Sequence, residues 1–238
     1  MDLKNAVVLI TGANRGLGLA LAQVLLKAGA RKIYAAARDP ASVTLAGVQP
    51  LKLDVGNAAD IAAAVAACPD VNVLINNAGI ALGSGILAPD AVAAARSELE
   101  INLFGPMLLS QGFAPVLARN GGGAIVNVIS ALSWVSFPTS ATYSVSKSAA
   151  WALTNGLRNE LHGQGTQVLA AHMGYMDTGM TARLSVDKTD PQEIAEKIVA
   201  ALAAGEEEVL ADAATQQVKQ GFSAERGLYL GAPLGAPA

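Results

Sequence analysis

Residues 6–29 read AVVLITGANRGLGLALAQVLLKAG, which is a short apolar run, a glycine-rich turn and a segment of helical period. The last segment places Leu17, Leu21 and Leu25 on one side, and Gly29 follows it. Apolar residues repeated at this spacing are typical of an amphipathic helix, and a glycine just beyond them is a common helix end. The stretch therefore predicts a buried strand joined by a tight turn to a helix, which is the opening of a parallel crossover unit.

The turn at residues 11–18 has the spacing T-G-x-x-x-G-x-G. Its glycines permit a tight turn, close approach of the backbone to a pyrophosphate and close helix packing, while the helix N-terminus offers free N–H groups. The spacing differs from G-x-G-x-x-G, and no Lys-Ser or Lys-Thr pair follows it as in a P-loop. A dinucleotide site is predicted here, with an ordinary glycine-rich turn as the alternative. The residues assigned to the cofactor in this turn are Gly12, Asn14, Arg15, Gly16, Leu17 and Gly18.

Strand-length apolar runs alternate with helical segments along most of the chain. Further strands are expected at residues 32–36, 48–53, 71–75, 124–129 and 167–171, with a short edge strand at 207–211. Helices are expected at residues 58–67, 89–119, 139–162 and 191–204. The strand runs are continuous rather than alternating, which is typical of strands covered on both faces. The predicted fold class is α/β: a single domain, residues 1–238, with a Rossmann-like, doubly wound parallel sheet flanked by helices on both faces.

Composition narrows the range of functions. The chain has 238 residues, 52% of them hydrophobic and 15% charged, so it can bury a large core. The formal net charge is −3 and no basic block occurs, so nucleic acid is not an expected partner. One cysteine, Cys68, and two histidines leave no disulfide and no zinc cluster, so no metal is expected and Cys68 is predicted to be buried and inert. The N-terminal apolar run is far shorter than a membrane helix and lacks a signal-peptide layout, so we expect a cytoplasmic protein without a membrane partner.

Ligands of such sheets bind beyond the carboxyl ends of the strands, and the end of the second strand indicates which cofactor binds. There an acidic residue suits a free ribose 2′-hydroxyl and an arginine suits a 2′-phosphate. Residues 35–38 read AAAR, so no carboxylate ends the strand, and Arg38, helped by Arg15, would pair with a phosphate. Asp39, followed by Pro40, is more simply a turn residue. We predict NADP(H) in preference to NAD(H), with NAD(H) as the alternative.

The pair of reacting groups is predicted on the helix at residues 139–162. Among four tyrosines only Tyr143 has a lysine four positions on, Lys147, and residues at this spacing are neighbours on a helix. Bringing a phenol pKa from about 10 to about 7 takes about 4 kcal/mol. An ammonium about 4 Å away at an effective dielectric of about 20 supplies about that much. We therefore interpret Tyr143 as a general acid/base activated by Lys147; the alternative is a surface lysine stacked on a tyrosine.

A serine at the end of the fifth strand is the candidate for orienting a carbonyl group. Ser130 closes the run NVIS, 13 residues before Tyr143, and its hydroxyl could bond a substrate carbonyl while Tyr143 delivers the proton. Ser133, Ser136 and Ser140 are rivals for this role. A serine at a strand end is also ordinary turn chemistry.

These motifs together resemble the short-chain dehydrogenase/reductase family, in its compact NADP(H)-dependent carbonyl reductase type. The resemblance spans about residues 7–212. It rests on the turn at residues 11–18, the sequence NNAG at residues 76–79, Asn102, Ser130, Tyr143 and Lys147.

The resemblance implies a role for each polar residue of the reacting centre. It makes Tyr143 the general acid/base, Lys147 its activator and a ligand of the nicotinamide ribose, and Ser130 the group that orients the carbonyl. It makes Asn102 the helix-kinking anchor of a water that leads to Lys147. For Asn102 the alternative is a polar residue in a helix already bent near residues 105–106, which are Gly and Pro.

The family pattern also extends to the periphery of the site. The segment between the second and third strands is short, so little or no helix is expected there. The family often has Pro-Gly after the sixth strand, and Met173 replaces the proline here, so the shape of that turn is open. A homodimer or homotetramer built on the long fourth and fifth helices is implied. The further cofactor contacts are Asp54 and Val55 at the adenine, Asn77, Ala78 and Gly79 at the adenosine side, and Met176 and Thr178 at the carboxamide.

The substrate side of the predicted site is apolar. Residues 175–190 are the expected lid, and residues 227–238 form a Gly- and Pro-rich tail that is either loose or docked on a neighbour. Core packing is the alternative explanation for any single apolar residue of the pocket. The expected pocket residues are Leu132, Trp134, Phe137, Met173, Tyr175, Met176 and Met180.

The sequence thus predicts an oxidoreductase that reversibly transfers hydride between NADPH and an apolar ketone or aldehyde. A non-catalytic NADP(H)-binding sensor and an NAD(H)-preferring alcohol dehydrogenase are the alternatives. A serine hydrolase would need a G-x-S-x-G elbow, and the sequence contains none. Epimerase or dehydratase relatives have a longer carboxyl-terminal substrate domain, for which this chain has no room.

Overall fold

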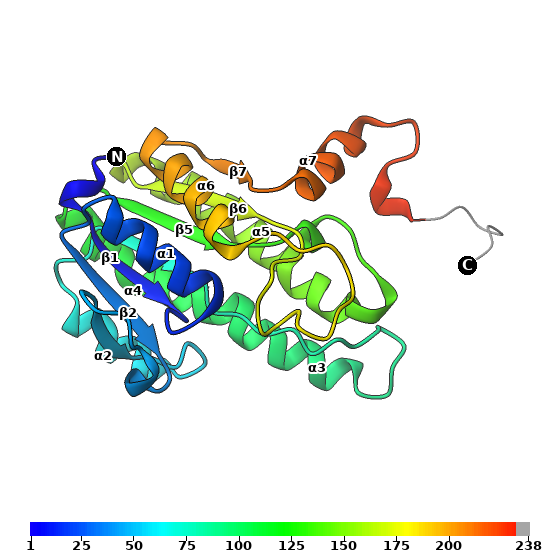
Figure 1. Ribbon diagram of the computed structural model, residues 1–238, viewed down its shortest axis with the longest axis horizontal. Coiled ribbons are helices and arrows are strands. Elements are labelled where there is room, and N and C mark those ends of the chain that lie inside the picture. Colours follow the sequence, from blue (N-terminus) through cyan, green and yellow to red (C-terminus); the bar gives the residue numbers. More distant parts are fainter. Residues whose placement is uncertain (232–238) are drawn as a thin grey trace.

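The computed structural model describes residues 1–231, and these residues form a parallel sheet of seven strands in the order β3-β2-β1-β4-β5-β6-β7 (Figure 1). This confirms the predicted doubly wound α/β fold. The strand order reverses between β1 and β4: β2 and β3 follow on one side of β1, and β4 to β7 lie on the other. Such sheets form their ligand crevice at this point. The strands are β1 (Val7–Thr11), β2 (Lys32–Ala37), β3 (Gln49–Lys52), β4 (Val73–Asn76), β5 (Ala124–Val128), β6 (Gln167–His172) and β7 (Glu208–Leu210).

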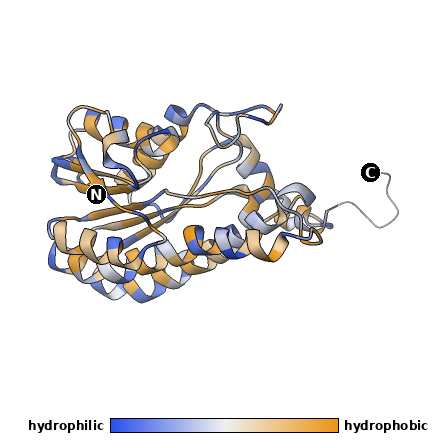
Figure 2. Cartoon of the chain, turned by 90° about the horizontal axis from the view of Figure 1, so that it is seen from below, coloured by the Kyte–Doolittle hydropathy of each residue, from blue (hydrophilic) through white to orange (hydrophobic). Residues whose placement is uncertain are grey.

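Helices cover both faces of the sheet (Figure 2). Helices α1 and α6 pack on one face, while α2 and α4 pack on the other together with the end of α5. Helix α7 follows β7 and was not expected from the sequence. Of the predicted tail, residues 228–230 form a short 3₁₀ turn, and residues 232–238 lie outside the described residues. The helices are α1 (Gly16–Lys27), α2 (Ala58–Ala67), α3 (Ala91–Leu99), α4 (Gly105–Arg119), α5 (Ala141–Leu161), α6 (Pro191–Ala204) and α7 (Ala213–Gln220).

The continuous apolar strands supply two hydrophobic cores at once. Val8 and Ile10 of β1 lie in the cluster with α1 and α6, whereas Val7 and Leu9 lie in the cluster with α2 and α4. Successive side chains of a strand point to opposite faces, so a strand buried on both sides is apolar at every position. The central strands follow this rule, as the sequence predicts.

The two edge strands, β3 and β7, are not buried on both faces. Three of the four residues of β3 are exposed, and all three residues of β7 are half-buried, so the expectation of cover on both faces is wrong for the run at residues 48–53. The reason lies in the connection between β2 and β3. It contains only the 3₁₀ turn Pro40–Ser42, as expected from its length, and no helix of this connection covers β3.

The predicted helix at residues 89–119 is one continuous path with a change of winding in the middle. Between α3 and α4, residues Glu100–Phe104 form a π-helical segment in which the N–H of Gly105 donates to the carbonyl of Glu100, five residues back. In an α-helix the carbonyl of Asn102 would accept from residue 106. That residue is Pro106, which has no N–H, so the α-helical ladder fails at this carbonyl.

The same path is also strongly apolar. Residues Ala91–Arg119 form 29 helical residues, within which a window of 18 residues has a mean hydropathy of 1.3, so the path is long and apolar enough to cross a membrane by length and composition alone. In this fold Leu109, Phe113, Val116 and Leu117 of α4 point into the core beneath the sheet. Their apolar character therefore has an explanation in core packing.

Candidate active site

The turn between β1 and α1 requires its glycines for different reasons. Gly12 and Gly16 have φ values of +65° and +55°, a region that favours glycine. Gly18 has no such φ, but a Cβ placed on it would lie 2.2 Å from the carbonyl oxygen of Gly12. The amide of Asn77 ties this turn to the loop after β4 by donating to the carbonyl of Thr11 over 2.8 Å. The start of α1 is thus packed so closely on the turn that no side chain fits at Gly18.

The surroundings of the turn suit an anionic ligand. Arg15 precedes the first residue of α1, whose free N–H groups face the turn, and its side chain makes no capping bond. Arg15 and Arg38 are both exposed, and neither takes part in an ion pair within residues 1–231. Asp39 accepts from the N–H of Ala41 over 3.0 Å, which is the role of a turn residue. The residues present therefore fit the phosphates of a dinucleotide.

The other predicted cofactor residues lie along the same edge of the sheet. Thr178 sits over the turn, since a Cβ built on Gly16 would lie 3.4 Å from its Cγ2. Asp54 is half-buried and accepts from the N–H of Gly56 over 3.0 Å. Val55 is buried, and its carbonyl oxygen would lie 2.7 Å from a Cβ on Gly105. Asp54 thus also caps its own turn, so its side chain is partly occupied by the backbone.

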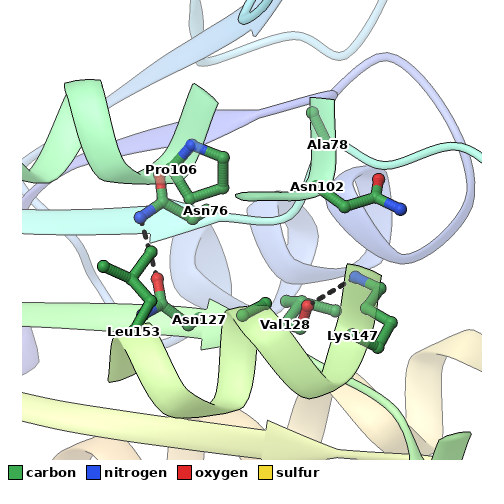
Figure 3. Close-up of a pocket in the computed structure, with 9 residues that line it drawn as sticks. Asn76, Ala78, Asn102, Pro106, Asn127, Val128, Lys147 and Leu153 are labelled. Atoms are coloured by element: carbon green, nitrogen blue, oxygen red, sulfur yellow. Dashed lines mark hydrogen bonds between the residues drawn. The ribbon is translucent and has the colours of Figure 1, made fainter. Parts of the chain in front are cut away.

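Tyr143 and Lys147 lie one turn apart on α5. The Nζ atom of Lys147 is 5.6 Å from the centre of the Tyr143 ring. It donates to the carbonyl of Val128 at the end of β5 over 2.9 Å (Figure 3). Asn102 joins the π-helical segment to the loop after β4 and to α5. Its amide exchanges two bonds of 2.9 Å with the backbone of Ile80 in that loop and donates to Ser146 of α5 over 2.9 Å. The three elements that carry Asn102, Lys147 and Val128 are therefore locked together by polar contacts.

A small internal cavity of about 10 Å³ lies beside the Lys147 side chain (Figure 3). This is about the smallest space that holds one water molecule. The buried Oδ1 atom of Asn76, on the cavity wall, has no hydrogen-bond partner among the described residues. Val128, whose carbonyl accepts from Lys147, also lines the cavity. The cavity thus combines an ammonium donor with polar acceptors, which is what the predicted water next to Lys147 needs.

The electrostatics of the pair differ from the sequence expectation. Burial raises the pKa of the Tyr143 phenol above its usual value, and the carboxylate of Glu98 raises it further. Burial also lowers the pKa of Lys147 to about 8. The expectation that Lys147 alone brings the phenol close to neutrality is therefore wrong for the protein by itself, because burial acts on both groups and spacing along a helix does not reveal it. At neutral pH Tyr143 holds its proton and is an acid.

Ser130 begins the turn that follows β5. Its Oγ accepts from the N–H of Leu132 over 3.1 Å, and its side chain is buried. Its own hydroxyl proton has no acceptor within residues 1–231, so it remains available to a ligand. Among the rivals, Ser133 donates to the carbonyl of Ser130 over 2.7 Å and Ser136 is exposed. Ser140 is half-buried, and its Oγ has no hydrogen-bond partner among the described residues.

The expected pocket residues are distributed between the mouth and the interior. Phe137, Tyr175 and Met180 are exposed, at 49%, 37% and 54%. Met173 belongs to the core cluster with α1 and α6, so the expectation that it lines the pocket is corrected. The three exposed side chains, which lie on the segment between Ser130 and Tyr143 and on the expected lid, are called the apolar mouth below.

The remaining pocket residues are less open. Leu132 and Trp134 are buried, and Met176 packs against the core cluster. The ends of the expected lid are joined, because Thr189 donates to the carbonyl of Tyr175 and accepts from Asp177, each over 2.9 to 3.0 Å.

Two acidic residues of the site escaped the sequence reasoning. Glu98 is fully buried one turn before Asn102, and its carboxylate accepts from the N–H of Leu82 over 2.7 Å. Asp212 accepts from the N–H of Gly174 over 2.5 Å and so holds the turn in which Met173 replaces the usual proline. Glu98 lies four residues before Asn102, so the two residues share one side of the helical path. This spacing indicates a buried Glu98 only when Asn102 is known to face inward.

The comparisons with known proteins agree with this geometry. The family model for short chain dehydrogenases matches residues 6–189. The chain belongs to the short-chain dehydrogenase/reductase family. A crystal structure of a short chain dehydrogenase from Burkholderia cenocepacia in complex with NADP is 38% identical, with a TM-score of 0.93 and 100% of both chains covered.

Two curated members of the short-chain dehydrogenase/reductase family show the same relationship over part of their length. The short chain dehydrogenase tazN of Aspergillus terreus is 35% identical over 195 residues, covering 75% of this chain and 42% of the relative. Dehydrogenase/reductase SDR family member 7B of Mus musculus is 35% identical over 195 residues, covering 75% of this chain and 60% of the relative. The chain therefore matches less than two thirds of the length of either relative.

Replacement of Gly18 by alanine tests the shape of the turn. The new Cβ would clash with the carbonyl of Gly12 at 2.2 Å, so the turn must open and NADPH binding should weaken by about tenfold or more. The measurement is titration of NADPH fluorescence. Gly163→Ala is the matched control, because a Cβ there meets nothing within 4 Å. Equal affinity of the two variants would contradict the role of Gly18.

Replacement of Lys147 by methionine tests the buried ammonium. The pKa of Lys147 is lowered to about 8, so its contribution to stability is present above its unfolded pKa and is lost as pH falls through about 8. The unfolding free energy of the wild type relative to Lys147→Met should therefore rise by about 3 kcal/mol at most between about pH 8 and pH 10.5. Thermal melts of both proteins across this range provide the measurement. A difference that stays constant with pH would show that Lys147 is not buried as a charge.

Proposed function

We propose that the protein reversibly transfers hydride between NADPH and the carbonyl carbon of an apolar ketone or aldehyde, as a carbonyl reductase or alcohol dehydrogenase. The observation that carries the proposal is the position of Lys147: one turn from Tyr143 on α5, it donates to the carbonyl of Val128 at the end of β5, two residues before Ser130. This is the same edge of the sheet as the glycine turn after β1. A protein that only binds the cofactor has no need for an acid, a buried cation and a free hydroxyl proton together.

The side chains divide the work of the reduction. NADPH supplies the hydride when bound. The Ser130 hydroxyl donates a hydrogen bond to the carbonyl oxygen, which polarises the bond. As the carbon accepts the hydride, the C=O electron pair moves to oxygen and Tyr143 delivers its proton there, giving the alcohol. The phenolate left behind is stabilised by the Lys147 ammonium, whose position is fixed by the carbonyl of Val128.

Three observations support NADP(H) as the preferred cofactor. Arg38 is the first charged side chain after β2, and Arg15 is likewise exposed at the glycine turn. Asp39, the rival that would favour NAD(H), is occupied in capping its own turn. The related Burkholderia cenocepacia protein was solved with NADP. An arginine pair of this kind suits a 2′-phosphate better than a free hydroxyl.

The apolar mouth supports the substrate class. Phe137, Tyr175 and Met180 are exposed around the site, and no charged group is needed to bind a neutral carbonyl compound. Assembly into a homodimer or homotetramer is part of the proposal. Phe104, Leu108 and Val145 are exposed at 44%, 39% and 45% on the elements from the π-helical segment to α5, and a second subunit would cover them.

The test of the reaction follows nicotinamide absorbance with NADPH and NADH over a panel of ketones and aldehydes. The wild type should consume NADPH, and Tyr143→Phe should lose about a thousandfold or more in kcat while NADPH still binds, because only the transferred proton is removed. Turnover unchanged in Tyr143→Phe would overturn the mechanism. Cofactor binding without turnover over the whole panel would favour the non-catalytic sensor.

The cofactor preference has a separate test. Arg38→Asp replaces the proposed 2′-phosphate partner by a like charge, so the KM for NADPH should rise by about tenfold or more while that for NADH falls or stays unchanged. Steady-state kinetics with both cofactors provide the measurement. An unchanged KM for NADPH would refute the assignment of Arg38.

A further inference from the structure

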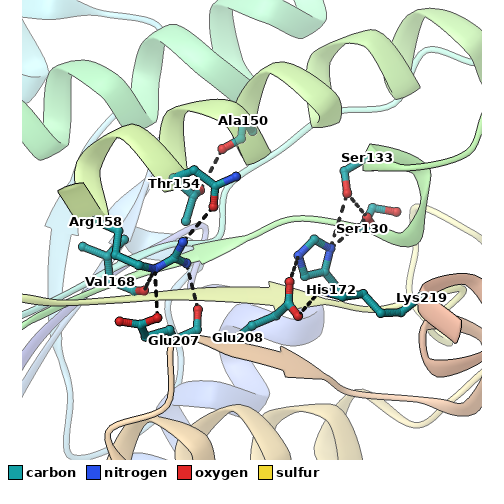
Figure 4. Close-up of polar contacts among 11 residues, drawn as sticks. Ser130, Ser133, Ala150, Thr154, Arg158, Val168, His172, Glu207, Glu208 and Lys219 are labelled. Atoms are coloured by element: carbon teal, nitrogen blue, oxygen red, sulfur yellow. Dashed lines mark hydrogen bonds and ion pairs between the residues drawn. The ribbon is translucent and has the colours of Figure 1, made fainter. Parts of the chain in front are cut away.

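A fully buried histidine contacts the backbone of the proposed catalytic serine. His172 is the last residue of β6, and its Nδ1 atom lies 3.3 Å from the carbonyl oxygen of Ser130 and 3.3 Å from the Oγ of Ser133 (Figure 4). Its other ring nitrogen, Nε2, lies 3.7 Å from the carboxylate of Glu208 on β7. Its ring stacks on Trp134 with 3.8 Å between the ring centres. No step of the proposed reaction uses this residue.

The contacts of Nδ1 determine where the imidazole proton sits. A carbonyl oxygen only accepts, so the Ser130 carbonyl requires a donor at Nδ1. The Ser133 hydroxyl donates to the same carbonyl over 2.7 Å, so its hydrogen is already used and its oxygen can only accept from Nδ1. Both neighbours therefore require the Nδ1–H form of His172.

The other side of the ring carries the cost of this form. In a neutral Nδ1–H imidazole, Nε2 is a bare acceptor, and here it is buried with no hydrogen-bond partner within residues 1–231. The group opposite is the carboxylate of Glu208, which would accept from an Nε2–H, but it lies 3.7 Å away, beyond hydrogen-bond distance, and is ion-paired with Lys219 of α7. An unsatisfied buried acceptor is costly. The fold therefore tolerates this cost at Nε2 and keeps the bond at Nδ1.

We propose that His172 is a positioning residue for Ser130: as a neutral ring in the Nδ1–H form, it donates to the Ser130 carbonyl and holds the turn that presents the Ser130 hydroxyl to the substrate. The inference rests on the proposed function of Ser130. The other bonds of Ser133 and Leu132 to Ser130 lie within the turn itself, whereas His172 links the Ser130 carbonyl to β6. The turn has a second link at its next residue, where the N–H of Ala131 donates to the carbonyl of Met173 over 2.9 Å.

Burial keeps the ring neutral, while the charged groups around it act in both directions. Glu208 on β7 favours a second proton, while Lys219 on α7 and Arg158 on α5 oppose it. Burial is the largest effect and lowers the pKa of His172 to about 4. The ring thus stays in one protonation state over the range in which a cytoplasmic enzyme works.

The first test reads the tautomer directly and needs no substrate. The chain has two histidines, and the other, His162, is exposed, so His162→Asn leaves a single imidazole to observe. Two-bond ¹H–¹⁵N correlation spectra should show a protonated Nδ1 and a bare Nε2 at about pH 7, unchanged down to about pH 5. An Nε2–H ring, or titration near the ordinary pKa of about 6.5, would overturn the proposal.

The second test separates positioning from a general structural effect. His172→Ala should lower kcat by about tenfold or more while the Kd for NADPH changes less than about twofold, because the turn and not the cofactor site is disturbed. His172→Asn places an amide N–H near the position of Nδ1 and should restore most of the loss. His162→Asn is the control and should behave as the wild type.

The deciding measurement is a double-mutant cycle. In a Ser130→Ala background the His172→Ala change should cost less than about twofold in single-turnover rate, because the hydroxyl that it positions is gone. The same loss in both backgrounds would overturn the proposal. A wild type without carbonyl turnover would count against the proposed function, whereas the tautomer spectrum would still decide the state of His172. If His172→Ala does not fold, His172→Phe, which keeps an aromatic ring against Trp134 but has no donor, takes its place in the cycle.

Discussion

The buried ammonium of Lys147 is the constraint around which the site is arranged. A charge removed from water is destabilising unless polar groups surround it. The carbonyl of Val128 is one such group, and the cavity beside Nζ has room for a water. Even Gly79 serves this arrangement, because a Cβ there would lie 3.7 Å from Nζ and 3.1 Å from the Asn102 amide oxygen. The sheet end, the π-helical segment and α5 therefore have to meet at one point.

The fold was predictable because its signal is local and repeated. Continuous apolar runs and amphipathic segments each indicate one element, and their alternation indicates a parallel sheet. The failures are at places where an element depends on its neighbours. The run at residues 48–53 is apolar like the central strands, yet β3 is an exposed edge, because no helix follows β2. The π-helical segment had a local signal, Pro106 four residues after Asn102, but periodicity alone does not show a change of winding.

The residues of the site could be predicted from the sequence where their function requires a fixed spacing along the chain. The glycine turn and the pair Tyr143 and Lys147 are separated by fixed numbers of residues, and the fold keeps these groups in reach of one another. His172 and Asp212 were missed because their partners are distant in sequence: His172 meets Ser130, and Asp212 meets Gly174. The phenol pKa was misjudged for a related reason. Burial depends on the whole fold, so a distance between two side chains does not determine the pKa of either.

The loop after β6 has a mechanical consequence. Tyr175 and Asp177 are both bonded to Thr189, so the two ends of the loop are fastened to each other, while Thr178 rests on the glycine turn at Gly16. As the proposed lid, a segment fastened in this way would move as one unit about its joined base, because its two ends are held together. The same movement would uncover the glycine turn and the apolar mouth, so the cofactor and the alcohol of the proposed reaction would leave by one route.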